Sequence, residues 1–204
     1  MSYDYSLLFQ NIIAAVSGGG SFEQRMNVLI THCENQIPNK GWSGFREIDY
    51  GADNDRLKHW LTLACAEAVP STLYKGIWFG LNNPVINGEP TADIYLAASQ
   101  TFDRGSIDWA ASASFYPVNG YLGSQVLSSI YRLAHSGSGA LQNYADYPLV
   151  LAYGAMAARA ALENTEFSGV FAQLNGAAVG FDSGDLLILG SFHGGSFETN
   201  VEIG

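Results

Sequence analysis

Cationic side chains are scarce in this sequence. Lysine and arginine together number 9, against 19 aspartates and glutamates, and the formal net charge is −10. Proteins that bind DNA, RNA or an anionic membrane surface use clustered lysine and arginine to contact phosphate groups. The composition therefore argues against nucleic acid and membrane partners, whereas it favours solubility and attraction to a basic partner protein.

Cysteines and long apolar runs are also rare. Cys33 and Cys65 are the only cysteines, and two thiols do not make the disulfide framework of a small secreted domain. No apolar run approaches the roughly 20 residues that a membrane-spanning helix needs. The first five residues lack the cationic start of a secretory signal. These absences predict a cytoplasmic protein.

The signatures of common catalytic and metal sites are missing as well. Glycines 18–20 are not followed by the Lys-Ser or Lys-Thr of a phosphate-binding loop, and no Gly-x-Ser-x-Gly elbow occurs. Adjacent helical residues such as His32 and Cys33 point about 100° apart, and His59 and Cys65 are not spaced to share one helix face. We therefore expect no catalytic residue, no metal and no cofactor.

Two pairs of apolar segments predict β-hairpins. Residues 76–81 and 93–99 are rich in aromatic and branched side chains and are separated by Pro, Asn and Gly, which predicts a hairpin over about 74–99. Both segments are almost fully apolar, so we expect cover on both faces of the sheet. Residues 177–181 and 185–189 predict a second hairpin over about 168–192, with Gly184 in a left-handed turn position.

Helical spacing of apolar residues predicts about five helices, at about 3–16, 21–36, 53–69, 122–135 and 146–162. The first two are separated by a Gly-rich break and are expected to form a helical hairpin over about 3–37. Ser21 and Gln24 have the spacing of a capping box at the start of the second helix. Asp53 or Asn54 is expected to cap the third helix.

The order of these segments predicts a single α+β domain over residues 1–204, in which an antiparallel sheet built from the two hairpins packs against the helices. Residues 193–204 are rich in glycine and glutamate and are expected to form a peripheral tail. Whether the two hairpins share one sheet is left open. A helix followed by a hairpin occurs twice, near 54–99 and 146–192, without a recurring residue motif.

Acidic and aromatic side chains gather in two connections. Asp103, Asp108 and Trp109 lie in the long segment 100–119, and Asp182 and Asp185 bracket the turn of the second hairpin. Aromatic anchors surrounded by charge are typical of protein-binding surfaces, so we predict that these five residues bind a partner. Two other roles stay open, because paired carboxylates can act in hydrolysis or bind Ca²⁺, and aspartates also stabilise turns.

Several short strings resemble bacterial immunity proteins, which neutralise polymorphic or contact-dependent toxins. They are GIWFGL at 76–81, DIYL at 93–96, FD at 102–103, DW at 108–109 and GFDSGDL at 180–186. The resemblance implies a small acidic cytoplasmic protein that binds and blocks the C-terminal domain of a cognate toxin. It assigns no functional residue, because the class includes many unrelated folds.

The leading hypothesis is therefore a non-enzymatic immunity protein. Its acidic, aromatic surface would occlude the cationic active-site cleft of a basic toxin domain, and charge complementarity would speed association. One alternative is a small hydrolase or ligand-binding enzyme that uses Asp182 or Asp185, which a pocket with convergent carboxylates would favour. Another is a structural subunit of a homo-oligomer, which an exposed apolar face would favour.

Overall fold

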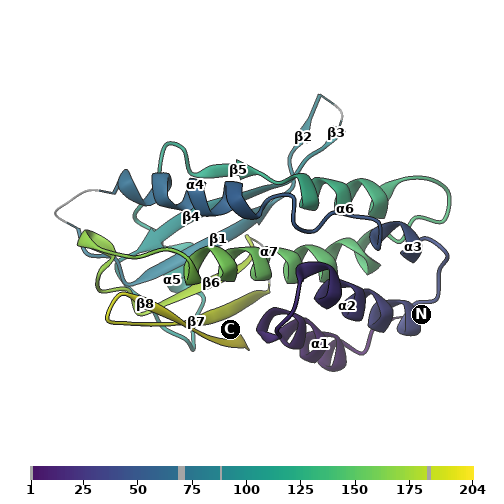
Figure 1. Ribbon diagram of the computed structural model, residues 1–204, viewed down its shortest axis with the longest axis horizontal. Helices are drawn as coiled ribbons and strands as arrows, with labels where there is room; N and C mark the ends of the chain where they lie inside the picture. The colour runs from purple at the N-terminus through teal and green to yellow at the C-terminus, as the bar shows by residue number, and fades with distance from the viewer. Residues whose placement is uncertain (1, 69–71, 88, 183–184) are drawn as a thin grey trace.

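Seven α-helices and eight strands make up the computed structural model, which describes residues 2–68, 72–87, 89–182 and 185–204 (Figure 1). The helices are α1 (Tyr5–Ser17), α2 (Phe22–Gln36), α3 (Trp42–Phe45), α4 (Asn54–Ala66), α5 (Asp108–Ala111), α6 (Gln125–His135) and α7 (Asp146–Glu163). The strands are β1 (Gly76–Asn82), β2 (Val85–Ile86), β3 (Glu89–Pro90), β4 (Asp93–Ser99), β5 (Tyr121–Gly123), β6 (Gly176–Phe181), β7 (Leu186–His193) and β8 (Ser196–Ile203). The architecture is α+β, as predicted.

The five predicted helices correspond to α1, α2, α4, α6 and α7, while the four-residue helices α3 and α5 were not predicted. Helices α1 and α2 pack against each other on either side of the Gly-rich break. The Ser21 hydroxyl accepts from the Gln24 amide, and the Gln24 side chain accepts from the Ser21 amide, so the expected capping box is formed. Local signals at helix starts are readable here because they depend on residues only a few positions apart.

Both hairpins belong to one six-stranded sheet with the order β5-β4-β1-β6-β7-β8. The prediction of an antiparallel sheet is wrong at the central pairing, where β1 and β6 run parallel and in register. Parallel neighbours need a long crossover connection, and the chain between the hairpins supplies one through α6 and α7. The other neighbouring pairs are antiparallel. The short hairpin β2–β3 forms a separate two-stranded sheet that projects from the top of Figure 1.

The segment expected to be a peripheral tail forms a strand instead. Residues Ser196–Ile203 make up β8, which pairs with β7 and lies at the edge of the sheet. Its exposed and half-buried residues alternate, as expected for a strand with one face toward the core. The Gly184 turn position predicted for the β6–β7 hairpin lies outside the described residues.

Helix α7 covers one face of the sheet, which we call the helix face. It packs against β1, β6, β7 and β8, and α1, α2, α4 and α6 surround it on its other sides (Figure 1). Every α7 residue from 148 to 158 is buried. Gly154 allows the close approach to the sheet, since a Cβ there would lie 2.6 Å from Cδ2 of Leu81. This face forms the main hydrophobic core.

The Asp53 side chain accepts hydrogen bonds from the start of α6 and does not cap α4, the helix that it precedes. Its side chain makes no cap hydrogen bond to α4. It accepts instead from the Ser124 hydroxyl at 2.6 Å and from the amides of Gln125 and Val126 at 3.2 and 3.1 Å. The carboxylate is 1% exposed, so this bonding satisfies a buried charge at the start of α6.

Candidate partner-binding surface

The opposite side of the sheet, which we call the α5 face, has glycine at four of its central positions. There β1 presents Gly76, Trp78 and Gly80, and β6 presents Gly176, Ala178 and Gly180. The parallel register places Gly76 beside Gly176 and Gly80 beside Gly180. Four glycines at matching positions therefore leave a shallow floor on which large side chains can lie.

Four aromatic rings occupy that floor. A Cβ added at Gly76 would lie 2.6 Å from the Trp109 ring, and one at Gly176 would lie 2.1 Å from the Phe102 ring. At Gly80 the added atom would lie 1.9 Å from Tyr95, and at Gly180 it would lie 2.9 Å from Trp78. At Gly76, Gly80 and Gly176 any side chain larger than hydrogen would displace these rings, because such separations are shorter than van der Waals contact. At Gly180 it would first meet the Asp185 carbonyl oxygen, at 2.4 Å.

Helix α5 and the loop around it form the cover of this face. Trp109 of α5 is 3% exposed and packs edge-on against Phe102 at 4.9 Å between ring centroids. Together with Trp78, Ala97, Ala178, Leu186 and Ile188 it forms a second, smaller hydrophobic cluster. This cluster confirms the prediction that both faces of the sheet are covered.

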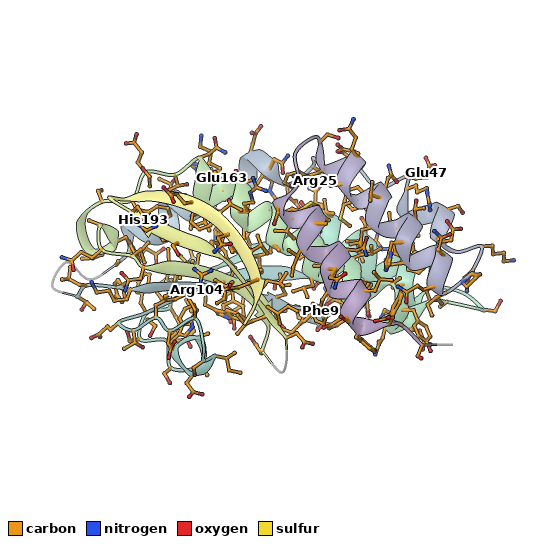
Figure 2. The ribbon with its side chains drawn as sticks, turned by 90° about the horizontal axis from the view of Figure 1, so that it is seen from below. Phe9, Arg25, Glu47, Arg104, Glu163 and His193 are labelled. Carbon is orange, nitrogen blue, oxygen red and sulfur yellow. The ribbon has the colours of Figure 1, made fainter. Side chains whose placement is uncertain are left out.

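Arg104 fastens the same loop to the far strands of the sheet. Its guanidinium donates to Glu202 Oε1 at 2.6 Å, to Ser191 Oγ at 2.7 Å and to the Asn200 carbonyl at 3.2 Å. Figure 2 shows Arg104 beside the ribbon of β8, with the loop extending beyond the sheet. Three contacts from one planar group fix the loop in position.

The cover is incomplete, and a pocket of about 590 Å³ opens between α5 and the sheet. We call it the acidic pocket; its described lining is Trp78, Tyr95, Ile107, Ala110, Ala111, Tyr116, Phe181, Asp182 and Leu186. Among these residues Asp182 alone carries a charge. An aromatic and aliphatic wall with one carboxylate is the usual composition of a specific binding site.

A chain of hydrogen bonds positions that carboxylate. The indole Nε1–H of Trp78 donates to the Tyr95 hydroxyl at 3.0 Å, and the Tyr95 hydroxyl donates to Asp182 Oδ1. Tyr95 starts on β4 and reaches Asp182 beyond β6 because its ring crosses the backbone of Gly80. Burial, followed by the bond to Asp182, raises the pKa of Tyr95. The tyrosine therefore stays protonated and acts as a donor at neutral pH.

Large apolar side chains at the pocket are exposed. Ile107 and Tyr116, which line it, are 49% and 58% exposed, and Tyr121 is 60% exposed. Tyr121 also packs against Tyr95, at 5.3 Å between ring centroids. Several such residues around one opening, with acidic neighbours, are characteristic of a binding surface.

The predicted residues Asp103 and Asp108 are both exposed on the loop that covers the α5 face. Asp103 accepts from the Gly105 amide at 2.9 Å, which shapes the local turn. Asp108 starts α5, directly between Ile107, which lines the acidic pocket, and Trp109. Asp182 lines the acidic pocket, whereas Asp108 is next in sequence to a lining residue and is not itself part of the described lining.

Trp109 and Asp185 are likewise absent from the described lining of the pocket. The Trp109 ring is buried beneath α5, so it supports the surface and is not exposed on it. Asp185 turns to the helix face, where it accepts a hydrogen bond from Tyr147 of α7. Burial, and then that bond, raises the pKa of Tyr147. Asp182 and Asp185 are thus bonded to tyrosines on opposite faces of the sheet.

Sequence reasoning missed Tyr95, Ile107 and the four floor glycines. The signal for the glycines was present, because Gly-x-x-x-Gly occurs at both 76–80 and 176–180. Two glycines four residues apart in a strand lie on one face and mark a place where something approaches the backbone closely. The interpretation that no residue motif recurs between the two hairpins was therefore wrong, because both contain Gly-x-x-x-Gly.

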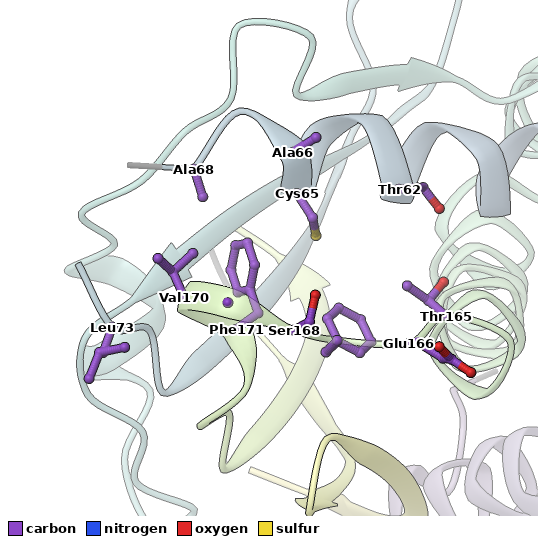
Figure 3. Close-up of a pocket in the computed structure, with 12 residues that line it drawn as sticks. Thr62, Cys65, Ala66, Ala68, Leu73, Thr165, Glu166, Ser168, Val170 and Phe171 are labelled. Carbon is purple, nitrogen blue, oxygen red and sulfur yellow. The ribbon is translucent and has the colours of Figure 1, made fainter. Parts of the chain in front are cut away.

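A second pocket, of about 510 Å³, lies between α4 and residues 165–171 (Figure 3). Figure 3 shows the Cys65 thiol and the Ser168 hydroxyl pointing into the space between these segments. Burial raises the pKa of the Cys65 thiol to about 12, so it is un-ionised at neutral pH and is a poor nucleophile.

No group of three or more His, Cys, Asp or Glu side chains suited to a metal occurs among the described residues. Within the same residues, no helix combines the length and apolar character needed to cross a membrane. Comparisons with known protein families, curated proteins and solved structures found no match to this chain.

Proposed function

We propose that this chain is a non-enzymatic binding protein that docks a basic partner protein on its α5 face. The observation that carries the proposal is the acidic pocket, which combines an unpaired carboxylate with aromatic walls and exposed apolar side chains at its rim. Protein-binding surfaces characteristically combine aromatic anchors with a polar rim.

The charges support a basic partner. None of the ion pairs within the described residues involves Asp103, Asp108 or Asp182. These carboxylates add to a net charge of −10 for the whole chain. A cationic surface would complement them, steer the encounter and make binding sensitive to salt.

The specific function that we propose is immunity to a bacterial toxin in the cytoplasm. The support is the resemblance in sequence together with the acidic charge, and the mechanism would be occlusion of a cationic active site. On this account the exposed carboxylates of Asp103 and Asp108, on the loop that covers the α5 face, act mainly on the rate of association, because exposed charges steer encounter more than they hold a complex. Asp182 and the aromatic residues act on its lifetime.

The two alternatives are less well supported. Hydrolysis by paired carboxylates needs them to flank one substrate, whereas Asp182 and Asp185 are bonded on opposite faces of the sheet. Self-association through the exposed apolar rim would bring Asp103, Asp108 and Asp182 of two copies together, and like charges oppose such a contact. A partner of opposite charge avoids this repulsion.

The experiment is affinity capture of the tagged chain from native lysate at low and high salt, with partners identified by mass spectrometry. The account predicts a stoichiometric partner with a basic domain that is retained at low salt and lost at high salt. An Asp103→Lys, Asp108→Lys double variant should recover less of it at low salt. Recovery of the chain alone at both salts, or only of a second copy, would contradict the proposal.

A further inference from the structure

Resting on the proposed function, we infer that the acidic pocket is a receptor for a single arginine side chain of the partner. The Asp182 carboxylate would pair with the guanidinium, and the aromatic walls of the pocket would flank it. The proposed contact is one arginine side chain in one pocket, whichever partner protein supplies that side chain.

The charge of the pocket favours a cation. Asp182 is the one charged residue among those described in the lining, and the remainder of the lining is aromatic or aliphatic apart from tyrosine hydroxyls. A neutral apolar group filling this pocket would strip water from the carboxylate without giving a counter-charge, which is costly. A cation removes that cost, so the pocket selects for positive charge.

The shape and the weak hydration of a guanidinium suit the aromatic walls of the pocket. Trp78, Tyr95 and Tyr116 all line the pocket, and arginine stacks on aromatic faces better than lysine because its guanidinium is planar and weakly hydrated. Asp182 Oδ1 accepts from Tyr95, and no other described residue donates a hydrogen bond to Oδ2. That oxygen is therefore open to a guanidinium N–H.

The Asp182 carboxylate is already oriented in the unbound protein. The hydrogen bonds from Trp78 to Tyr95 and from Tyr95 to Asp182 hold the carboxylate in place before any ligand arrives. The Tyr95 ring can make this connection because Gly80 leaves room beneath it. A receptor fixed in advance loses less conformational freedom on binding, which favours affinity.

Nuclear magnetic resonance of the four tryptophan indole N–H groups tests the inference. The probe is the blocked tripeptide Gly-Arg-Gly, titrated to millimolar concentration, and its neutral match is the same peptide with citrulline in place of arginine. The Trp78 indole signal, assigned with Trp78→Phe, should shift saturably with the arginine peptide because it donates to the residue that binds Asp182. The citrulline peptide should bind about tenfold more weakly or not at all.

Two variants and two further probes complete the design. Asp182→Asn should weaken the arginine peptide about tenfold or more, whereas Asp185→Asn, whose carboxylate bonds on the other face, should leave it unchanged. The lysine peptide should bind more weakly than the arginine peptide. An unmoved Trp78 signal, equal shifts with citrulline, or an undiminished response in Asp182→Asn would overturn the inference. Tetramethylammonium, a cation without N–H groups, is the second probe. A larger shift of the Trp78 signal with tetramethylammonium than with the arginine peptide would also overturn the inference.

The two proposals can fail separately. A basic partner captured from lysate without any response to the arginine peptide would leave the proposed function standing and remove the arginine receptor. A selective response to the arginine peptide without a captured partner would leave the receptor standing and remove the partner-binding function as stated.

Discussion

The two faces of the sheet differ in how completely they are covered. On the helix face, α7 and the four helices around it bury one continuous core. On the α5 face, a four-residue helix and its loop bury six residues, and the cover then stops at the acidic pocket. The helix face therefore provides most of the folding stability, while the α5 face leaves part of the sheet open at the acidic pocket.

The carboxylates of the two sides also differ, both in burial and in their hydrogen bonds. On the helical side of the molecule Asp53 is 1% exposed and Asp146 is 8% exposed, and both accept hydrogen bonds from residues on other helices. On the α5 face Asp103, Asp108 and Asp182 are exposed and make no ion pair with a described residue. Buried carboxylates are paired because the fold requires it, whereas unpaired exposed ones remain available to a partner.

The largest expected effect is on the anchor of the α5 cover. Trp109→Ala should lower the free energy of unfolding by about 3–5 kcal/mol, because it removes a buried indole from a small cluster, and it should also release α5 from the sheet. Trp109→Phe should cost clearly less, because the Trp109 Nε1 has no hydrogen-bond partner among the described residues. Urea unfolding of both variants measures this. If Trp109→Ala and Trp109→Phe lowered the free energy of unfolding equally, the indole nitrogen would have a role that packing does not explain.

A smaller effect is expected from raising the glycine floor. Gly80→Ala places a Cβ 1.9 Å from the Tyr95 ring, so the ring must move, and overpacking of this kind costs about 1–3 kcal/mol. The Trp78 indole resonance should shift because its acceptor moves. Gly19→Ala is the matched control, since a Cβ there meets no atom within 4 Å. An unchanged Trp78 signal in Gly80→Ala would contradict the placement of Tyr95.

The smallest effect is expected from the hydrogen-bond chain alone. Tyr95→Phe removes the hydroxyl that joins Trp78 to Asp182 and should lower the free energy of unfolding by about 0.5–1.5 kcal/mol. Binding at the acidic pocket should weaken more noticeably, because the carboxylate loses its orienting donor. Tyr121→Phe serves as a control, since its hydroxyl donates to no other described residue. If both variants bind alike, the chain does not position Asp182.

Much of the fold could be predicted from the sequence because its signals are local. Apolar spacing located the five longer helices, and the Ser21–Gln24 pair identified the start of α2. The parallel pairing of β1 and β6 could not be predicted, because it depends on contacts about a hundred residues apart and not on either segment alone. Helix α5 was missed because four residues are too few for a helical pattern.

The site residues were predicted because acidic side chains stand beside aromatic ones in the sequence. Asp182 lines the acidic pocket and Asp108 follows a lining residue, and the binding role of both stays a prediction. The same reasoning could not tell that the Trp109 ring is buried while Ile107 and Tyr116 are exposed. That distinction depends on the room left by Gly76, which lies in a strand more than thirty residues away from the indole it accommodates.

The most direct test of the division between the two faces is a matched capture experiment. Tyr116 at the rim of the acidic pocket and Tyr5 on α1 are each 58% exposed, so substituting either one with serine removes a ring of equal accessibility. The account predicts that Tyr116→Ser recovers much less of the basic partner from native lysate than the wild type, while Tyr5→Ser recovers as much. Equal recovery by the two variants, or selective loss with Tyr5→Ser, would contradict the assignment of binding to the α5 face.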